Sequence, residues 1–220
     1  MPRRAHDFRA LTQPTRMRLL HAVQRDPGRH ADELATAIDV PLNTVRDHLR
    51  VLVEEGFVHA EPEHRPSRGR PPLGYHPVRD VTASAEAAAR VDGARRRGEL
   101  LRAVTGERLE ETDAERPQRE QLDVLYEHFE DAGLQPTIDE RSLVVDLVPC
   151  RYYDQLDEDR AVVCAVHARL ATDVLRQAGG PLALRRVEPF VAPHRCRLTL
   201  GAAPSSGSPE ISGLAPADSG

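Results

Sequence analysis

Apolar residues recur at helical spacing three times within the first 56 residues of the chain. Residues 11–26 carry them every three or four positions and end in a turn-forming Asp-Pro-Gly. Residues 31–40 repeat the pattern over a shorter length, and residues 41–55 form a third stripe that stops at Gly56. The pattern predicts three short helices, the third starting at a proline. The inward stripe of the third predicted helix consists of Leu42, Val45, Leu49 and Leu52.

The outward side of the third predicted helix carries side chains suited to DNA. Asparagine pairs with adenine, arginine pairs with guanine, and threonine hydrogen-bonds to phosphate. A short turn between two helices followed by such a helix is typical of a major-groove reader. The predicted DNA-contacting residues of this helix are Asn43, Thr44, Arg46 and Arg50.

Residues 57–78 contain two short extended runs around a tip rich in Arg, Pro and Gly. Arg65, Arg68 and Arg70 lie in this tip with no acidic residue between them. This arrangement predicts a wing that lies on the DNA backbone or in the minor groove. The alternative is a solvated hairpin beside a helical module that binds protein.

Two segments, LTQPTRMRLLHAV and VPLNTVRDHLRVLVEEGFV, resemble the ArsR-type winged-helix repressors. The run GRPPLGY resembles the wing of the branch that includes the repressor of the Suf iron-sulfur assembly operon. The resemblance implies a winged helix-turn-helix fold and a DNA-binding repressor. The cysteine pair typical of metal-sensing ArsR proteins is absent near the third helix, which argues against their usual arsenic or zinc site.

Charge divides unevenly along the 220 residues, whose net charge is −5. Residues 1–80 hold 13 arginines against 11 acidic residues, whereas residues 81–220 hold 17 against 24. Residues 1–80 can therefore approach the DNA phosphates, whereas the acidic residues 81–220 are repelled by them. The expected domains are a winged helix-turn-helix (1–80), a helical linker (81–118), a cysteine-containing sensor domain (119–202) and a tail without fixed structure (203–220).

The linker is rich in Ala, Arg and Glu, and we expect a helix interrupted near Gly93 and Gly98. Its apolar strip is too thin to fold alone. Two copies packed together would give a homodimer that matches a palindromic operator. The alternative is a solvated linker helix with one apolar side. The strip consists of Leu100, Leu101, Val104 and Leu109.

The remaining pattern predicts a helix at 122–133, a strand at 142–149, a helix at 160–180 and two final strands. Apolar residues of the helix predicted from residue 160 onward form a stripe that faces inward. The predicted fold class is mainly α, with an N-terminal winged helix-turn-helix and an α+β C-terminal domain. The stripe comprises Val163, Val166, Leu170 and Val174.

Three cysteines fall on three different elements of this predicted domain. Cys150 follows the first strand, Cys164 lies early in the helix, and Cys196 alternates with inward-facing leucines of the last strand. Cys164 and His167 are three residues apart and share a helix face. Three thiolates and one further ligand suit an iron-sulfur cluster or zinc. Spacing alone leaves three ordinary buried cysteines equally open.

The segments LVPC, VVCAVH and RCRL resemble the C-terminal pattern of the Suf-type repressors, in which three cysteines ligate a cluster. The resemblance implies that Cys150, Cys164 and Cys196 hold an iron-sulfur cluster, [4Fe–4S] in preference to [2Fe–2S], with zinc as the alternative. We choose His167 as the fourth ligand, with His194 as its rival. The family's usual Asn-Cys-Pro is replaced by Val-Pro-Cys-Arg here.

The expected function is a transcriptional repressor whose operator affinity depends on the cluster. A repressor with a small-molecule pocket and a cofactor-free thiol switch remain alternatives. We expect no enzyme, because no nucleophile and base pair can be identified. The acidic run at 154–159 fits a helix start or a solvated face. No leader opens the chain and no apolar run approaches about 20 residues, so we expect a cytoplasmic protein without membrane contact.

Overall fold

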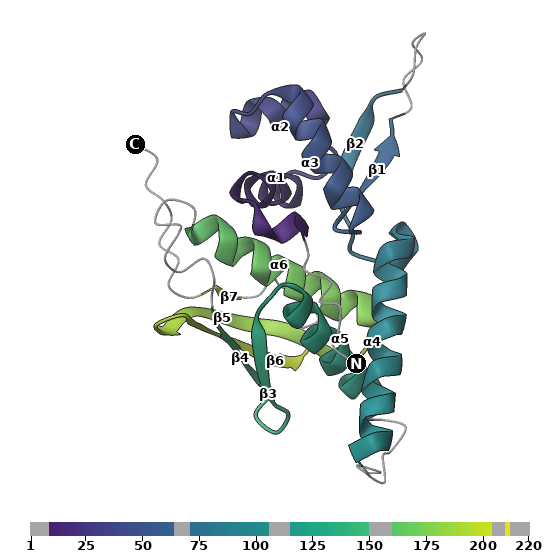
Figure 1. Cartoon of the computed structure of the whole chain (residues 1–220), viewed down its shortest axis with the longest axis vertical. Coiled ribbons are helices and arrows are strands. Elements are labelled where there is room, and N and C mark those ends of the chain that lie inside the picture. Colours follow the sequence, from purple (N-terminus) through teal and green to yellow (C-terminus); the bar gives the residue numbers. More distant parts are fainter. Residues whose placement is uncertain (1–8, 64–70, 106–114, 150–159, 204–209, 212–220) are drawn as a thin grey trace. The chain divides into compact units, whose positions relative to one another are not determined.

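The computed structural model describes residues 9–63, 71–105, 115–149, 160–203 and 210–211. The chain forms two compact units, an N-terminal unit (Phe8–Ala88) and a C-terminal unit that begins at Ala89 (Figure 1). Each unit has a hydrophobic core of its own. None of the helices among the described residues has the length and apolar content needed to cross a bilayer.

The N-terminal unit consists of three helices followed by a two-stranded hairpin. Its core comes from the inward stripes of the helices, as the sequence predicts, and Leu20, Leu34 and Leu49 are almost fully buried. The elements are η1 (Arg9–Thr12), α1 (Pro14–Arg25), α2 (Ala31–Ile38), α3 (Leu42–Glu54), β1 (Val58–Pro62), β2 (Leu73–Pro77) and η2 (Val81–Ala83).

Two glycines set the connections in this unit. Gly56 ends α3 with a φ of +65°, and a Cβ there would lie 2.8 Å from the Ser84 hydroxyl oxygen. Gly28 has a φ of +91°, and its N–H donates to the carbonyl of Tyr75 at 2.8 Å. The Tyr75 N–H in turn donates to the carbonyl of Arg29. The turn after α1 therefore pairs with β2 through two backbone hydrogen bonds. Only glycine adopts these conformations without strain.

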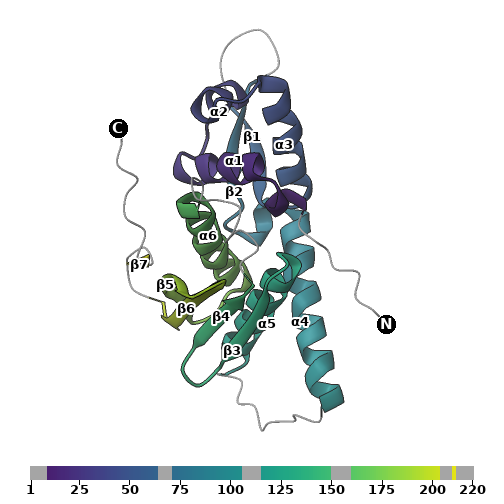
Figure 2. The ribbon, with the colours of Figure 1, turned by 60° about the vertical axis from the view of Figure 1, so that its left-hand side comes forward.

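Helix α4 (Ala85–Thr105) is continuous, and the expected interruption near Gly93 and Gly98 is wrong. Contacts with α5 (Arg116–Asp131), which lies beside it in Figure 2, explain the difference. The carboxylate of Asp123 occupies the space next to Gly98 where any side chain would stand. Arg102 pairs with that carboxylate at 2.9 Å. Tertiary ion pairing thus outweighs the roughly 1 kcal/mol helix penalty of each glycine.

The C-terminal unit is a two-layer α+β fold in which α5 and α6 pack together and contact the sheet. The sheet order is β3-β4-β6-β5-β7, and every pair is antiparallel except β5 with β7. Besides α4 and α5, the elements are β3 (Gln135–Asp139), β4 (Val144–Val148), α6 (Arg160–Ala178), β5 (Leu182–Ala192), β6 (Arg195–Ala202) and β7 (Glu210–Ile211).

Two strands were not expected from the sequence. Strand β3 contains Pro136 and lies at the sheet edge, where proline is tolerated. Strand β7 falls in the tail for which no fixed structure was expected, and it pairs with Arg186 and Val187 of β5. Helix α5 also starts earlier than expected, at Arg116.

Candidate functional site

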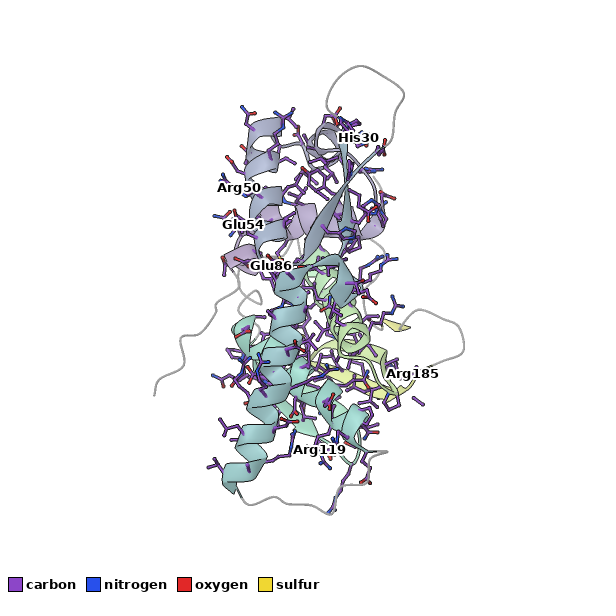
Figure 3. All side chains as sticks on the ribbon, turned by 90° about the vertical axis from the view of Figure 1, so that its right-hand side faces the viewer. His30, Arg50, Glu54, Glu86, Arg119 and Arg185 are labelled. Carbon is purple, nitrogen blue, oxygen red and sulfur yellow. The ribbon has the colours of Figure 1, made fainter. Side chains whose placement is uncertain are left out.

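The outward side of α3 presents the predicted DNA-contacting residues to solvent. Asn43, Thr44, Arg46 and Arg50 are all exposed. The guanidinium of Arg50 pairs with Asp47 at 3.5 Å and with Glu54 at 3.9 Å on its own helix. Figure 3 shows Arg50 and Glu54 projecting from the same side of the helix. The charge of Arg50 is therefore partly compensated within α3.

Arg46 lies near the hairpin. Burial raises the pKa of the Tyr75 hydroxyl on β2, and the positive charge of Arg46 opposes that rise. The guanidinium of Arg46 is therefore close enough to the Tyr75 hydroxyl for its charge to act on it. The wing residues Arg65, Arg68 and Arg70 lie outside the described residues, and their DNA contacts stay predictions.

A small cavity in the C-terminal unit is lined by two of the cysteines and one of the histidines that the sequence singled out. Cys164 and His167 of α6 and Cys196 of β6 line the same cavity, whose volume is about 30 Å³. Cys164 and Cys196 are thiols. The other lining side chains are apolar: Leu134, Leu147, Val163, Ala168, Val187, Pro189 and Leu198. We call this space the thiol cavity.

The sequence predicted part of this arrangement. Cys164 and His167 share a face of α6, and Cys196 faces inward together with Leu198. Cys150 lies outside the described residues. His194 sits at the turn between β5 and β6 with a φ of 57° and is not among the residues lining the cavity. Of the two candidate histidine ligands, His167 is the one next to the thiols.

Cross-strand register holds Cys196 in place. Cys196 lies opposite Leu147 of β4, and its neighbour Arg197 lies opposite Asp146. The guanidinium of Arg197 donates to both carboxylate oxygens of Asp146, at 2.8 and 3.1 Å. These bonds lower the pKa of the Asp146 carboxyl. A bidentate pair adds geometric specificity to strand pairing, so it fixes which way Cys196 faces.

Burial sets the protonation of the cavity histidine. Loss of solvation lowers the pKa of His167 to about 4, so its imidazole is neutral near pH 7, which is the form that binds metals. Burial also lowers the pKa of His128 on α5 to about 3, with further contributions from Arg90 and His167. His128 therefore lies near His167. His128 was not predicted from the sequence, although it follows buried Leu125 by three residues on one helix face.

The donor set fits a soft metal group. Thiolates and imidazole are ligands of zinc and of iron-sulfur clusters rather than of hard cations. Within the described ranges, no three His, Cys, Asp or Glu side chains are already closed around a metal position. A volume near 30 Å³ corresponds to about one water molecule. A space of this size is closer to that of a single ion than to that of a cuboidal cluster, which would require the lining residues to separate.

Comparison with known families identifies the N-terminal unit. Residues 11–61 match the family model described as a helix-turn-helix domain. The matched residues run from η1 through β1 and include all of α3. No curated protein and no solved structure matches the chain significantly. The match supports a DNA-binding transcriptional regulator, with an N-terminal helix-turn-helix and a C-terminal region of mixed helices and antiparallel sheet.

Proposed function

We propose that this protein is a transcriptional repressor whose operator affinity is set by an iron-sulfur cluster in the C-terminal unit. The ligands are Cys150, Cys164 and Cys196, with His167 as the fourth. The observation that carries the proposal is the convergence of two thiols and a neutral imidazole on one apolar cavity. The resemblance of the cysteine segments to the Suf-type repressors supports iron-sulfur over other soft metals.

When bound, the cluster would link α6 to β6, and oxidants would remove this link by destroying the cluster. The residues of this chain do the rest: α6 presents Cys164 and His167, β6 presents Cys196, and apolar side chains keep water away. Holding α6 and β6 together favours one packing of the C-terminal unit. If the packings with and without the cluster differ by about 1.4 kcal/mol in the free energy of DNA binding, operator affinity differs about tenfold between them.

The first experiment is an ultraviolet-visible spectrum of protein purified without oxygen, with iron, acid-labile sulfide and zinc assayed on the same sample. A broad band near roughly 400 nm with matching iron and sulfide supports the proposal. Stoichiometric zinc without colour supports a zinc site instead, which the small cavity volume favours. Absence of both metals overturns the cofactor proposal.

Replacing Arg46 by alanine is expected to weaken operator binding by about 1–3 kcal/mol, or about 5- to 150-fold. The reason is the loss of a bidentate contact to a base. Arg50→Ala should have a smaller effect, because Asp47 and Glu54 already pair with Arg50. Fluorescence anisotropy with operator DNA at fixed salt measures both.

The control for this test is Arg185→Ala, which removes an exposed arginine of β5 in the C-terminal unit. Its affinity for operator DNA should equal that of the wild type. If Arg46→Ala binds operator as tightly as Arg185→Ala does, α3 is not the base-reading helix.

The protein is proposed to act as a homodimer on a palindromic operator. Leu100, Leu101 and Val104 of α4 have exposed fractions of 64, 62 and 77%. Together with Tyr126 and Ile138 they line a groove of about 530 Å³ between α4 and α5. Contiguous exposed apolar surface of this kind marks an interaction site. We assign it to α4 of a second copy.

The double variant Leu100→Glu/Val104→Glu is therefore expected to shift the protein toward monomer, because it places two carboxylates in the apolar contact. Light scattering coupled to size exclusion measures the mass. Val191→Glu is the matched control, since Val191 of β5 is also exposed, at 43%. A double variant with the wild-type mass would remove α4 from the dimer contact.

A further inference from the structure

One wall of the thiol cavity is an irregular part of β5. Strands β5 and β6 pair regularly at Glu188 with Arg197 and again at Ala192 with Arg195. Between these two pairs β6 has one residue, Cys196, whereas β5 has three. A bulge of this kind interrupts the ladder of hydrogen bonds between two strands. We call the three residues the β5 bulge: Pro189, Phe190 and Val191.

The β5 bulge has an unfavourable backbone conformation. Phe190 has a φ of 56°, in the left-handed region that residues with a bulky side chain adopt only at an energetic cost. Pro189 has no N–H that could donate to a neighbouring strand. A strained backbone persists only where surrounding contacts hold it in place. The bulge therefore depends on what its side chains contact.

Helix α6 supplies such a contact. The guanidinium carbon of Arg160 lies 5.1 Å from the centroid of the Phe190 ring, within the range of a cation–π interaction. Arg160, Cys164 and His167 share a face of α6, because they are four and three residues apart. Cys164 and His167 line the thiol cavity. The cation–π contact is thus one helical turn from Cys164, on the face of α6 that lines the cavity.

Pro189 connects this contact to the cavity. Pro189 lines the thiol cavity and is covalently bonded to Phe190, so a displacement of Phe190 moves a wall of the cavity. Apart from Leu134, the other lining residues lie in α6 or at regularly paired strand positions. Segments with few backbone hydrogen bonds open locally at the lowest free energy. The β5 bulge is therefore the wall that moves most easily.

We infer that the β5 bulge is a gate of the thiol cavity and that the contact between Arg160 and Phe190 is its latch. When the contact breaks, the bulge moves outward, and small soft reagents such as metal ions reach Cys164 and Cys196. The closed cavity of about 30 Å³ holds about one water molecule, so a larger group enters only through such a movement. Entry of a cluster rests on the proposed function, whereas access to the thiols does not.

The test is labelling of the metal-free full chain by iodoacetamide without oxygen. Mass spectrometry of the digested protein gives separate rates for Cys164 and Cys196. Both cysteines should react slowly in the wild type, because the gate is closed. Arg160→Gln and Phe190→Leu are each expected to raise both rates about 2- to 30-fold, which is the factor that a lost cation–π contact contributes to the opening equilibrium.

Two further variants are the controls. Val191→Thr changes an exposed residue of the β5 bulge that takes no part in the cation–π contact, and it should label at the wild-type rate. Arg160→Lys keeps a cation beside the ring, so it should label close to the wild-type rate. Agreement of Arg160→Lys with the wild type assigns the effect of Arg160→Gln to the lost charge.

Labelling at low urea concentrations separates a gate from general destabilisation. Opening of a few residues exposes little surface, so the rates should depend weakly on urea, whereas labelling through unfolding follows the slope of the unfolding transition. The inference is overturned by a steep urea dependence in Arg160→Gln and Phe190→Leu, or by rates equal to that of Val191→Thr. A protein that labels as expected but binds neither iron nor zinc refutes the proposed function and leaves the gate intact.

Discussion

Serine in place of Cys164 or Cys196 is expected to abolish the cofactor and its effect on operator affinity. A cluster that loses one of three thiolate ligands is not retained, because a hydroxyl is not a comparable ligand for iron. The iron and sulfide content should fall to background in either variant. Operator affinity, measured with and without oxygen exposure, should then be the same in both conditions.

His194→Asn is the control for the cysteine variants, because His194 does not line the cavity. It should keep the wild-type metal content. Cys164 is only 6% exposed, so Cys164→Ala is included to separate ligand loss from the effect of a buried hydroxyl. Wild-type iron and sulfide in both the serine and the alanine variants would remove Cys164 from the site.

Replacing Gln121 by leucine is expected to destabilise the C-terminal unit by roughly 3 kcal/mol or more. Gln121 is 1% exposed. Its Nε2 donates to the carbonyls of Leu175 and Leu182, each at 2.9 Å, and its Oε1 accepts from the N–H of Leu182 at 2.7 Å. Leucine fills the volume but leaves three buried backbone groups without these partners, which is the larger part of the penalty.

Urea unfolding followed by circular dichroism measures this effect, with two transitions allowed for two units. Gln118→Leu is the matched control, since Gln118 lies on the same helix one turn earlier and is half-buried. Its stability should stay within about 0.5 kcal/mol of the wild type. Equal stability of the two variants would show that the Gln121 bonds contribute nothing net.

The buried hydrogen-bonding role of Gln121 could not be predicted from the sequence. Gln121 precedes buried Leu122 in α5 and lies four residues before Leu125, so it falls beside the predicted apolar stripe. The sequence pattern predicted a helix only from residue 122, so Gln121 fell outside it. Its role depends on where α6 ends and β5 begins, and neither is a local property of α5.

The sequence by itself determined the N-terminal unit. Each helix there is short and amphipathic, with turn residues such as Gly28 and Gly56 at its end, so local spacing was sufficient to define both the core and the exposed side of α3. The same local logic placed Cys164 and His167 on one face of α6. Periodicity encodes these features within a few residues, and the structure agrees.

Only the tertiary structure decided the features that join distant segments. Ion pairs with α5 keep α4 continuous through Gly98, and an edge position admits the proline of β3. Packing of α6 against the sheet brings Cys196 to the cavity of Cys164, and cross-strand register brings His76 to His59. These contacts join residues 17 to 32 positions apart, and helix or strand periodicity carries no information on which distant residues become neighbours.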